Sequence, residues 1–308
     1  MDARTIRVGG LRVRVVEVAP RDERDDPVFM IHGLGGWAEN WRDIMPAIAE
    51  SGRRAIAVDL PGFGESERPR RPRYFDPDRP FYAPFVFDAL DELGIERAHV
   101  AGHSLGGAVA YTAAMWRPER VRTLTLVAPG GLGREVAREL RLLTLPGMGL
   151  LARIRRSDRL TRQVLYSCFD DPARCPESVV AEAVRYAAPA APEMVRALRS
   201  AVTFRSGVRD EIRLPWIARA GRYTGPALIV WGREDRILPV SLVEEARGIA
   251  PHAEVRIIPS CGHLVMVERP QALLEWLLPF LDRSSGSLPR PNDAGDFRSV
   301  PGGTMTPR

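Results

Sequence analysis

The sequence predicts an α/β fold in which a mostly parallel central sheet carries helices on both faces and a helical cap is inserted into the chain. Between residues 27 and 130, short apolar runs alternate with helical patterns, as they do in parallel sheets. From 131 to 224 helical patterns follow one another, broken by Pro and Gly. The alternation of strand and helix resumes at residue 226, so the segment in between is expected to leave the sheet and return to it.

The first predicted element is a β-hairpin. Residues 5–8 and 11–18 have the pattern of its two strands, and the pair Gly9-Gly10 suits the tight turn between them. After a polar connection, residues 27–31 form a short apolar run of the kind that parallel sheets bury on both faces. This run continues directly into the glycine-rich stretch 32–36.

A helix, a strand and a second helix come next. Apolar residues recur at helical spacing from Trp41 to Ile48, and Gly52 ends that helix. Residues 54–58 form the following strand, which leads into a turn-rich loop and an irregular segment rich in Arg and Pro. Residues 81–93 are expected to form the second helix.

The next strand leads into the stretch around which the chain is organised. An apolar run at 98–101 meets Gly-x-Ser-x-Gly at 102–106, and a helix of small residues follows. Glycine at positions 102 and 106 removes side chains that would collide across a sharp turn. Residues 123–127 predict one further strand before the cap.

Beyond the cap, the core is completed by two strands and two helices, at 226–231, 240–249, 255–258 and 272–281. Residues after that are rich in Ser, Gly and Pro and offer little to bury. We therefore expect four parts: the first part of the core at 1–130, the helical cap at 131–224, the second part of the core at 225–282 and a disordered tail at 283–308.

Composition is that of a globular enzyme, and neither a metal nor a cofactor is expected. The 308 residues are 45% hydrophobic and 27% charged, which is ordinary for such proteins. No apolar run reaches about 20 residues, so no membrane span is expected. The first residues lack a signal-peptide core, which favours a cytoplasmic location. Three scattered cysteines suit neither a disulfide framework nor a metal site.

The net charge of +5 comes from arginine alone, because the chain contains no lysine. These arginines are spread along the sequence without a nucleic-acid-binding motif, so no nucleic-acid partner is expected. The densest basic cluster falls at 153–162. A solvated helix face is the simplest interpretation of this cluster, and attraction to an acidic substrate or a membrane surface is the alternative.

The strand, turn and helix around Ser104 predict a nucleophile. A serine hydroxyl is a poor nucleophile at neutral pH, so it needs a base within reach and an acid that orients the base. Asp235 follows one late strand and His263 follows the next. The three residues occur along the chain in the order Ser104, Asp235, His263. Each follows the carboxyl end of a predicted strand, where open α/β sheets bind ligands. Glu234 is the alternative acid.

The negative charge that forms during acyl transfer needs hydrogen-bond donors. Backbone N–H groups after the turn at His32-Gly33 and after the nucleophile are the expected pair, which nominates Leu34 and Leu105. The glycine-rich stretch could instead be a weak phosphate-binding loop, but it lacks the Lys-Ser/Thr of a P-loop.

Together these motifs resemble the α/β-hydrolase superfamily, over about residues 28 to 282. The resemblance is carried by the stretches 32–36, 59–66, 102–107, 231–235 and 262–263, with Glu268 and Pro270 after them. It implies a Ser-His-Asp hydrolase that acts without a cofactor through an acyl-enzyme. A serine at position 104, and not an aspartate, argues against the epoxide-hydrolase and haloalkane-dehalogenase branches.

Within the superfamily, the chain resembles lid-bearing carboxylesterases and lipases and, more weakly, serine hydrolases that cleave C–C bonds in ring-fission products of aromatic compounds. Gly36, His103 and Leu264 stand where the second group usually has Pro, Asn and Trp. The resemblance therefore favours hydrolysis of a small-molecule ester. C–C hydrolysis, thioester hydrolysis, acyl transfer and a non-catalytic ligand-binding role remain alternatives, and monomer and homodimer both stay open.

Substrate-binding residues are nominated by position. The candidates are His32, Gly33, His103, Arg185 and Leu264, among which Arg185 would serve as a cationic anchor in C–C cleavage. Arg185 could equally be a solvated helix residue. Six apolar cap residues are candidates for shaping the acyl pocket or for joining the cap to the core: Leu142, Leu145, Met148, Leu150, Leu165 and Phe169.

Overall fold

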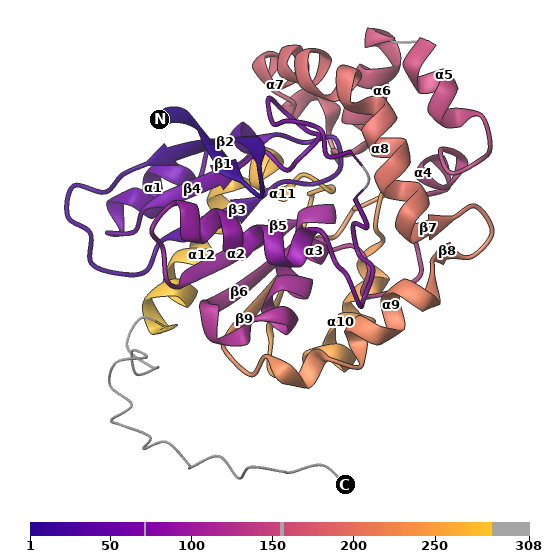
Figure 1. The fold of residues 1–308 in the computed structure, drawn as a ribbon. Coiled ribbons are helices and arrows are strands. Elements are labelled where there is room, and N and C mark those ends of the chain that lie inside the picture. Colours follow the sequence, from indigo (N-terminus) through magenta and orange to yellow (C-terminus); the bar gives the residue numbers. More distant parts are fainter. Residues whose placement is uncertain (71, 155–156, 285–308) are drawn as a thin grey trace, which may run out of the picture.

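The computed structural model describes residues 1–70, 72–154 and 157–284, and its strands form one large sheet and one small ribbon (Figure 1). The large sheet has the strand order β1-β2-β4-β3-β5-β6-β9-β10. Its strands are β1 (Asp2–Val8), β2 (Leu11–Val18), β3 (Val28–Ile31), β4 (Ala55–Val58), β5 (Ala98–His103), β6 (Val121–Val127), β9 (Ala227–Gly232) and β10 (Glu254–Ile258).

The sheet is parallel except at one edge. β1 pairs antiparallel with β2 through a two-residue turn whose glycines, Gly9 and Gly10, have φ of 56° and 83°. That backbone suits a hairpin turn with positive φ at both positions. β2 is also antiparallel to β4, whereas the neighbours from β4 to β10 are parallel. The predicted mostly parallel sheet is therefore confirmed.

Helices cover both faces of the sheet, as predicted. One apolar core cluster holds α2 (Tyr82–Glu92), α3 (Leu105–Trp116) and α10 (Val243–Ile249). The other holds α1 (Met45–Glu50) and α12 (Pro270–Ser284). A short helix that the sequence patterns did not predict, α11 (Val265–Glu268), joins this second cluster. The remaining short helical turns are η1 (Ala38–Trp41), η2 (Pro118–Arg120), η3 (Pro172–Arg174), η5 (Ala220–Arg222), η6 (Val240–Leu242) and the π-helical turn η4 (Ala183–Ala187).

The order of the strands brings two loops together. From β3 the chain passes to β4 on one side and then returns to β5 on the other side of β3. Ile31, the last residue of β3, is paired with Gly102 of β5. The loops that leave these two strands therefore start side by side, at the kind of switch point where α/β sheets bind ligands.

The segment predicted as the cap gathers mainly beyond one end of the sheet (Figure 1). Its helices are α4 (Arg138–Leu142), α5 (Met148–Ile154), α6 (Asp158–Ser167), α7 (Glu177–Glu182), α8 (Ala188–Ala201) and α9 (Asp210–Ile217). It is not purely helical, because β7 (Val202–Thr203) and β8 (Gly207–Val208) form a small antiparallel ribbon.

The last helix of this segment, α9, packs on the core. Trp216 is buried against Trp116 and donates its indole N–H to the carbonyl of Phe75 at 3.0 Å. The division at residue 224 thus remains a prediction about domains. At the other end of the chain α12 continues to Ser284, beyond the predicted start of the tail, and 285–308 lie outside the described residues.

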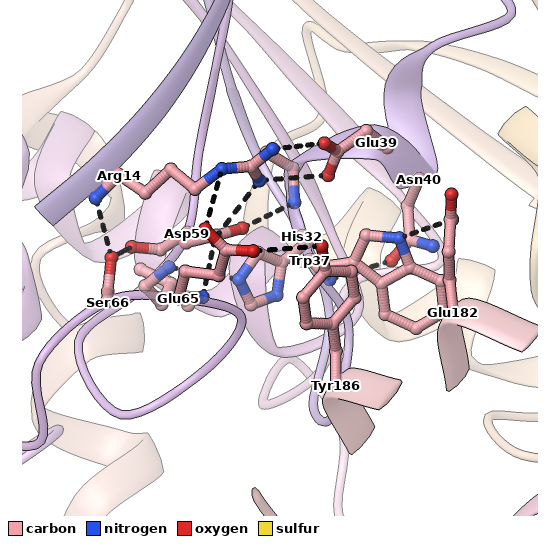
Figure 2. A network of polar contacts seen from close by, with 12 residues as sticks. Arg14, His32, Trp37, Glu39, Asn40, Asp59, Glu65, Ser66, Glu182 and Tyr186 are labelled. Carbon is pink, nitrogen blue, oxygen red and sulfur yellow. Dashed lines mark hydrogen bonds and ion pairs between the residues drawn. The ribbon is translucent and has the colours of Figure 1, made fainter. Parts of the chain in front are cut away.

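Polar contacts tie the cap to the core around Glu65 and Glu182 (Figure 2). Glu65 accepts a hydrogen bond from the Tyr186 hydroxyl at 3.1 Å and pairs with Arg185 at 3.0 Å. Glu182 accepts one from the Trp37 indole at 2.9 Å and pairs with Arg42. We call these contacts the cap latch, because each joins the core to the cap turn around α7 and η4.

Candidate active site

Ser104 lies in a strained turn between β5 and α3. Its φ of 52° and ψ of −115° fall where a residue with a side chain rarely lies. A Cβ on Gly102 would stand 2.1 Å from the carbonyl oxygen of Gly106, and one on Gly106 would stand 2.3 Å from that of Ile31. The predicted need for glycine at both positions is confirmed, and Ser104 lines a cavity.

Asp235 and His263 form a buried pair on the loops that follow β9 and β10. Asp235 Oδ2 lies 2.7 Å from His263 Nδ1, and the other oxygen accepts the amides of Ile237 and Leu238 at 2.8 and 2.9 Å. An ionised carboxylate can only accept hydrogen bonds, so Nδ1 carries the proton. In the neutral imidazole, Nε2 then carries the lone pair that a general base requires.

His103 connects the Ser104 turn to the histidine loop. Its ring centroid is 4.6 Å from that of His263, and its Nε2 donates to the His263 carbonyl at 3.0 Å. Burial holds the pKa of His103 well below the usual range, so this histidine is neutral. Because His103 directly precedes Ser104, the contact keeps the turn beside the loop that carries His263.

The cap also holds the histidine loop. The Cys168 carbonyl accepts the His263 amide at 2.7 Å. The buried carboxylate of Glu268 accepts the amides of Gly262, Asp170 and Asp171 at 2.7, 3.2 and 3.0 Å. One side chain thus joins the loop before His263 to the cap segment that follows α6.

Two backbone N–H groups are available beside Ser104. A Cβ on Gly33 would stand 3.1 Å from the Cβ of Ser104, so the loop after β3 touches the Ser104 turn. Within the described residues, the amides of Leu34 and Leu105 have no hydrogen-bond partner, and both residues line the cavity next to Ser104. Such a pair can stabilise an oxyanion.

Hydrogen bonds of the His32 ring hold the loop that follows β3. Its Nε2 accepts the Leu60 amide at 3.0 Å, which leaves Nδ1–H to donate to the Gly33 carbonyl at 2.7 Å. The ring is fully buried, and burial lowers the pKa of His32 to about 4. A neutral imidazole therefore fixes the turn from which Leu34 projects.

A mainly apolar cavity of about 110 Å³ opens at Ser104. Its floor comes from the core, through Leu34, Leu105, Ala108, Ile237 and Leu238. The core also contributes Phe75, Tyr111, Thr112 and Gly130. The predicted cap segment contributes the wall residues Gly131, Val136, Leu140, Ala197, Leu198, Ala201, Val202, Val208, Ile212, Arg213 and Trp216.

None of the five tentative substrate-binding residues lines this cavity. His32 and His103 are buried in the protein, Gly33 packs on His103, and the Leu264 amide donates to the Cys168 carbonyl. Arg185 lies apart from the cavity, where its largely exposed guanidinium pairs with Glu65 on the surface.

The six apolar cap residues nominated from the sequence do not line the cavity either. Leu165 and Phe169 are buried in the second core cluster, whereas Leu142 and Leu150 are exposed. The wall residues were missed, although Ile212 and Trp216 are four positions apart and so share a helix face.

Arg213 is the cationic side chain in the cavity wall. Its guanidinium donates to Asp210 and to the Leu132 carbonyl, each at 3.2 Å. Within the described residues, no group of three His, Cys, Asp or Glu side chains could hold a metal ion, and no helix is long and apolar enough to cross a membrane.

The chain is similar to a known protein family and to known proteins. A family model described as the alpha/beta hydrolase fold matches residues 26–161 and 193–270, more than half of the chain. The chain is 33% identical over 275 residues to the dihydrolipoyllysine-residue acetyltransferase component of the acetoin cleaving system of Pseudomonas putida, which covers 89% of this chain and 68% of that protein.

Two further similarities cover most of both chains. A 2-hydroxymuconate semialdehyde hydrolase of Pseudomonas sp. strain CF600 is 32% identical over 266 residues, or 83% of this chain and 86% of the relative. The crystal structure of a membrane phospholipase A, a bacterial virulence factor, superposes with a TM-score of 0.73 at 25% identity, covering 93% of this chain and 87% of that one.

Proposed function

Because the chain belongs to the alpha/beta hydrolase fold family, we propose that it is a serine hydrolase that cleaves small, uncharged carboxylic esters. The observation that carries this proposal is the position of Ser104, which lies in a strained turn at an apolar cavity, while the ring of its neighbour His103 packs on His263 of the Asp235–His263 pair. Ester hydrolysis needs a nucleophile, a base and an oxyanion site, and the cavity adds room for an apolar acyl or alcohol group.

In the proposed reaction, Ser104 Oγ attacks the ester carbonyl while His263 Nε2 accepts its proton. Asp235 stabilises the imidazolium that forms. His263 then protonates the departing alcohol, which leaves an acyl-enzyme. Water attacks this intermediate in the second half, with the same base, and releases the acid and free Ser104.

We assign the oxyanion site to the amides of Leu34 and Leu105. A tetrahedral intermediate places negative charge on the former carbonyl oxygen, which fixed N–H donors stabilise more than they stabilise the neutral carbonyl. Leu105 is the first residue of α3, so the positive end of the helix dipole acts in the same direction.

Cleavage of a C–C bond is the second candidate, and the similarity to a 2-hydroxymuconate semialdehyde hydrolase favours it. A ring-fission substrate is an anionic dienol, which needs a cationic anchor. Arg185 lies on the surface, and the two terminal nitrogens of Arg213 already donate to Leu132 and Asp210, although its buried Nε has no partner among the described residues. The cavity therefore supports an uncharged ester better.

The experiment compares a series of p-nitrophenyl esters of increasing acyl length with a ring-fission dienone. We expect ester turnover to exceed dienone turnover, and Arg185→Ala to leave ester hydrolysis within about twofold. Ser104→Ala should abolish fluorophosphonate labelling and lower ester turnover by about 10³-fold or more. Ser241→Ala, a change at an exposed serine, is the matched control.

Two outcomes would contradict the proposal. Labelling that persists in Ser104→Ala would place the nucleophile elsewhere. Faster decay of the dienone than of the best ester would establish the second candidate in place of the first.

A further inference from the structure

The outer surface of the cap exposes an unusual number of large apolar side chains. Ile154 is 70% exposed and Leu150 is 64% exposed. Six such side chains fall within α4 to α6, whereas the rest of the described chain has three, at Met1, Leu214 and Trp276. We call these six the cap face: Leu142, Leu150, Leu151, Ile154, Leu160 and Val164.

Helix geometry arranges the cap face in pairs. Leu150 and Ile154 are four residues apart on α5, and Leu160 and Val164 are four apart on α6, so each pair lies on one side of its helix. Leu165, on another side of α6, is buried in the core. α5 and α6 lie at the end of the cap away from the sheet (Figure 1).

Arginines outnumber the acidic side chains among these apolar pairs, where Glu139 and Asp158 are the exposed acids of α4 and α6. Arg138, Arg153 and Arg159 are exposed, and within the described residues none of them forms an ion pair. Arg162 pairs with Glu177 at 3.3 Å in an exposed contact, which is worth little in water. Within the part of the chain that the structure describes, this surface thus combines exposed apolar groups with three arginines outside any ion pair.

We propose that the cap face docks on the surface of an anionic lipid bilayer. Apolar side chains enter the interface between headgroups and acyl chains, while arginines remain with the phosphates. A second copy of the chain fits this surface less well, because it would bring the same unpaired arginines against one another.

Docking would place lipid next to the cavity. Leu140 of α4 lines the cavity beside Ser104, and Leu142, two residues later, belongs to the cap face. The same short helix therefore forms part of the cavity wall and part of the proposed docking surface. The proposal concerns binding, so it does not depend on which bond the enzyme cleaves.

The test is co-sedimentation of the full-length protein with vesicles of phosphatidylcholine alone or with added phosphatidylglycerol. We expect at least about tenfold stronger partitioning onto the anionic vesicles, weakened by high salt. The double variants Leu150→Asp/Ile154→Asp and Arg153→Gln/Arg159→Gln should each weaken it by about tenfold or more.

Leu214→Asp is the matched control, since Leu214 is an exposed leucine on α9, outside the cap face. It should partition like the unmodified protein. If the aspartate double variant melts early, the single change Ile154→Ser at the most exposed position replaces it. Equal, weak partitioning onto both vesicles would overturn the proposal. Self-association that the same variants abolish, without vesicle binding, would also overturn it and assign the surface to a second copy.

Discussion

The hydrogen-bond partners of Asp235 and His263 fix the positions of these two side chains. Asp235 uses one oxygen for the amides of Ile237 and Leu238 and the other for His263. With both oxygens engaged and the side chain fully buried, its geometry is fixed. The position of His263 follows from the same contacts, together with the cap carbonyl of Cys168.

We predict that Asp235→Asn lowers kcat by about 10³ to 10⁴-fold with little change in KM, because the imidazole loses its preferred tautomer and its charged partner. Steady-state kinetics on a short ester measures this. Glu234→Gln is the control, since its carboxylate accepts the Cys261 amide and a Gln carbonyl can do the same. Near-normal turnover in Asp235→Asn would mean that the acid lies elsewhere.

The buried His32 predicts a loss of stability in acid. Burial lowers its pKa to about 4, so between about pH 6.5 and pH 4 the unfolded chain binds a proton that the folded chain excludes. Stability from this residue is present above pH 6.5 and is lost as pH falls. Burial also lowers the pKa values of His99 and His103. It raises the pKa of Asp59 to about 6, which opposes the loss of stability as pH falls.

Comparison with His32→Gln isolates this residue, because Gln can still accept the Leu60 amide. The free energy of unfolding of the unmodified protein, relative to the variant, should fall by about 2 to 3 kcal/mol between pH 7 and pH 4.5. Urea unfolding at each pH provides the measurement. A difference that stays constant with pH would contradict the assignment.

At the scale of secondary-structure elements, the short helix α11 holds together two segments that are distant in the sequence. Glu268, the last residue of α11, joins the loop before His263 to the cap through three amides. We predict that Glu268→Ala lowers kcat about tenfold or more and destabilises the protein by about 3 kcal/mol, since buried amides lose a charged acceptor.

Glu268→Gln should recover much of the activity, because its carbonyl can still accept amide hydrogens. Glu177→Ala, at an exposed glutamate of the cap, should change neither kcat nor stability. Kinetics together with thermal unfolding separates the outcomes. If Gln and Ala reduce kcat equally, hydrogen bonding by Glu268 does not position the histidine loop.

At the scale of secondary-structure elements, the core strands could be predicted from the sequence, whereas the residues of the cavity wall could not. The strands at 27–31, 54–58 and 226–231 were located to within a residue, because runs buried on both faces are nearly continuous in apolar residues. The β7–β8 ribbon has two residues per strand and α11 has four residues, which is too short for either to show a period. The cavity wall depends on how the cap packs over Ser104, which local spacing does not specify.

At the scale of the whole molecule, the shape of the cavity depends on how firmly the cap is held on the core, because the cap supplies the cavity wall. The cap latch has two unequal halves. Arg185 and Glu65 are 69% and 44% exposed, so their ion pair is well solvated and contributes little. Arg42 and Glu182 are 22% and 25% exposed, and Glu182 also accepts the Trp37 indole N–H.

Glu182→Ala should therefore loosen the cap more than Glu65→Ala does. Removing the Glu182 carboxylate leaves the Trp37 N–H and one nitrogen of the part-buried Arg42 without their acceptor, while Arg42 Nε keeps the Glu39 carbonyl. Glu65→Ala removes the solvated pair with Arg185 and a 3.6 Å contact with Arg14, which keeps Glu39 and Asp59 as partners. Hydrogen exchange should speed up about tenfold across α7 and α8 in Glu182→Ala and about twofold or less in Glu65→Ala. The KM for long-chain esters should rise in the same order, because the cap supplies the cavity wall. Equal exchange in the two variants would show that burial does not rank these contacts, and unchanged exchange in both would mean that apolar packing alone holds the cap.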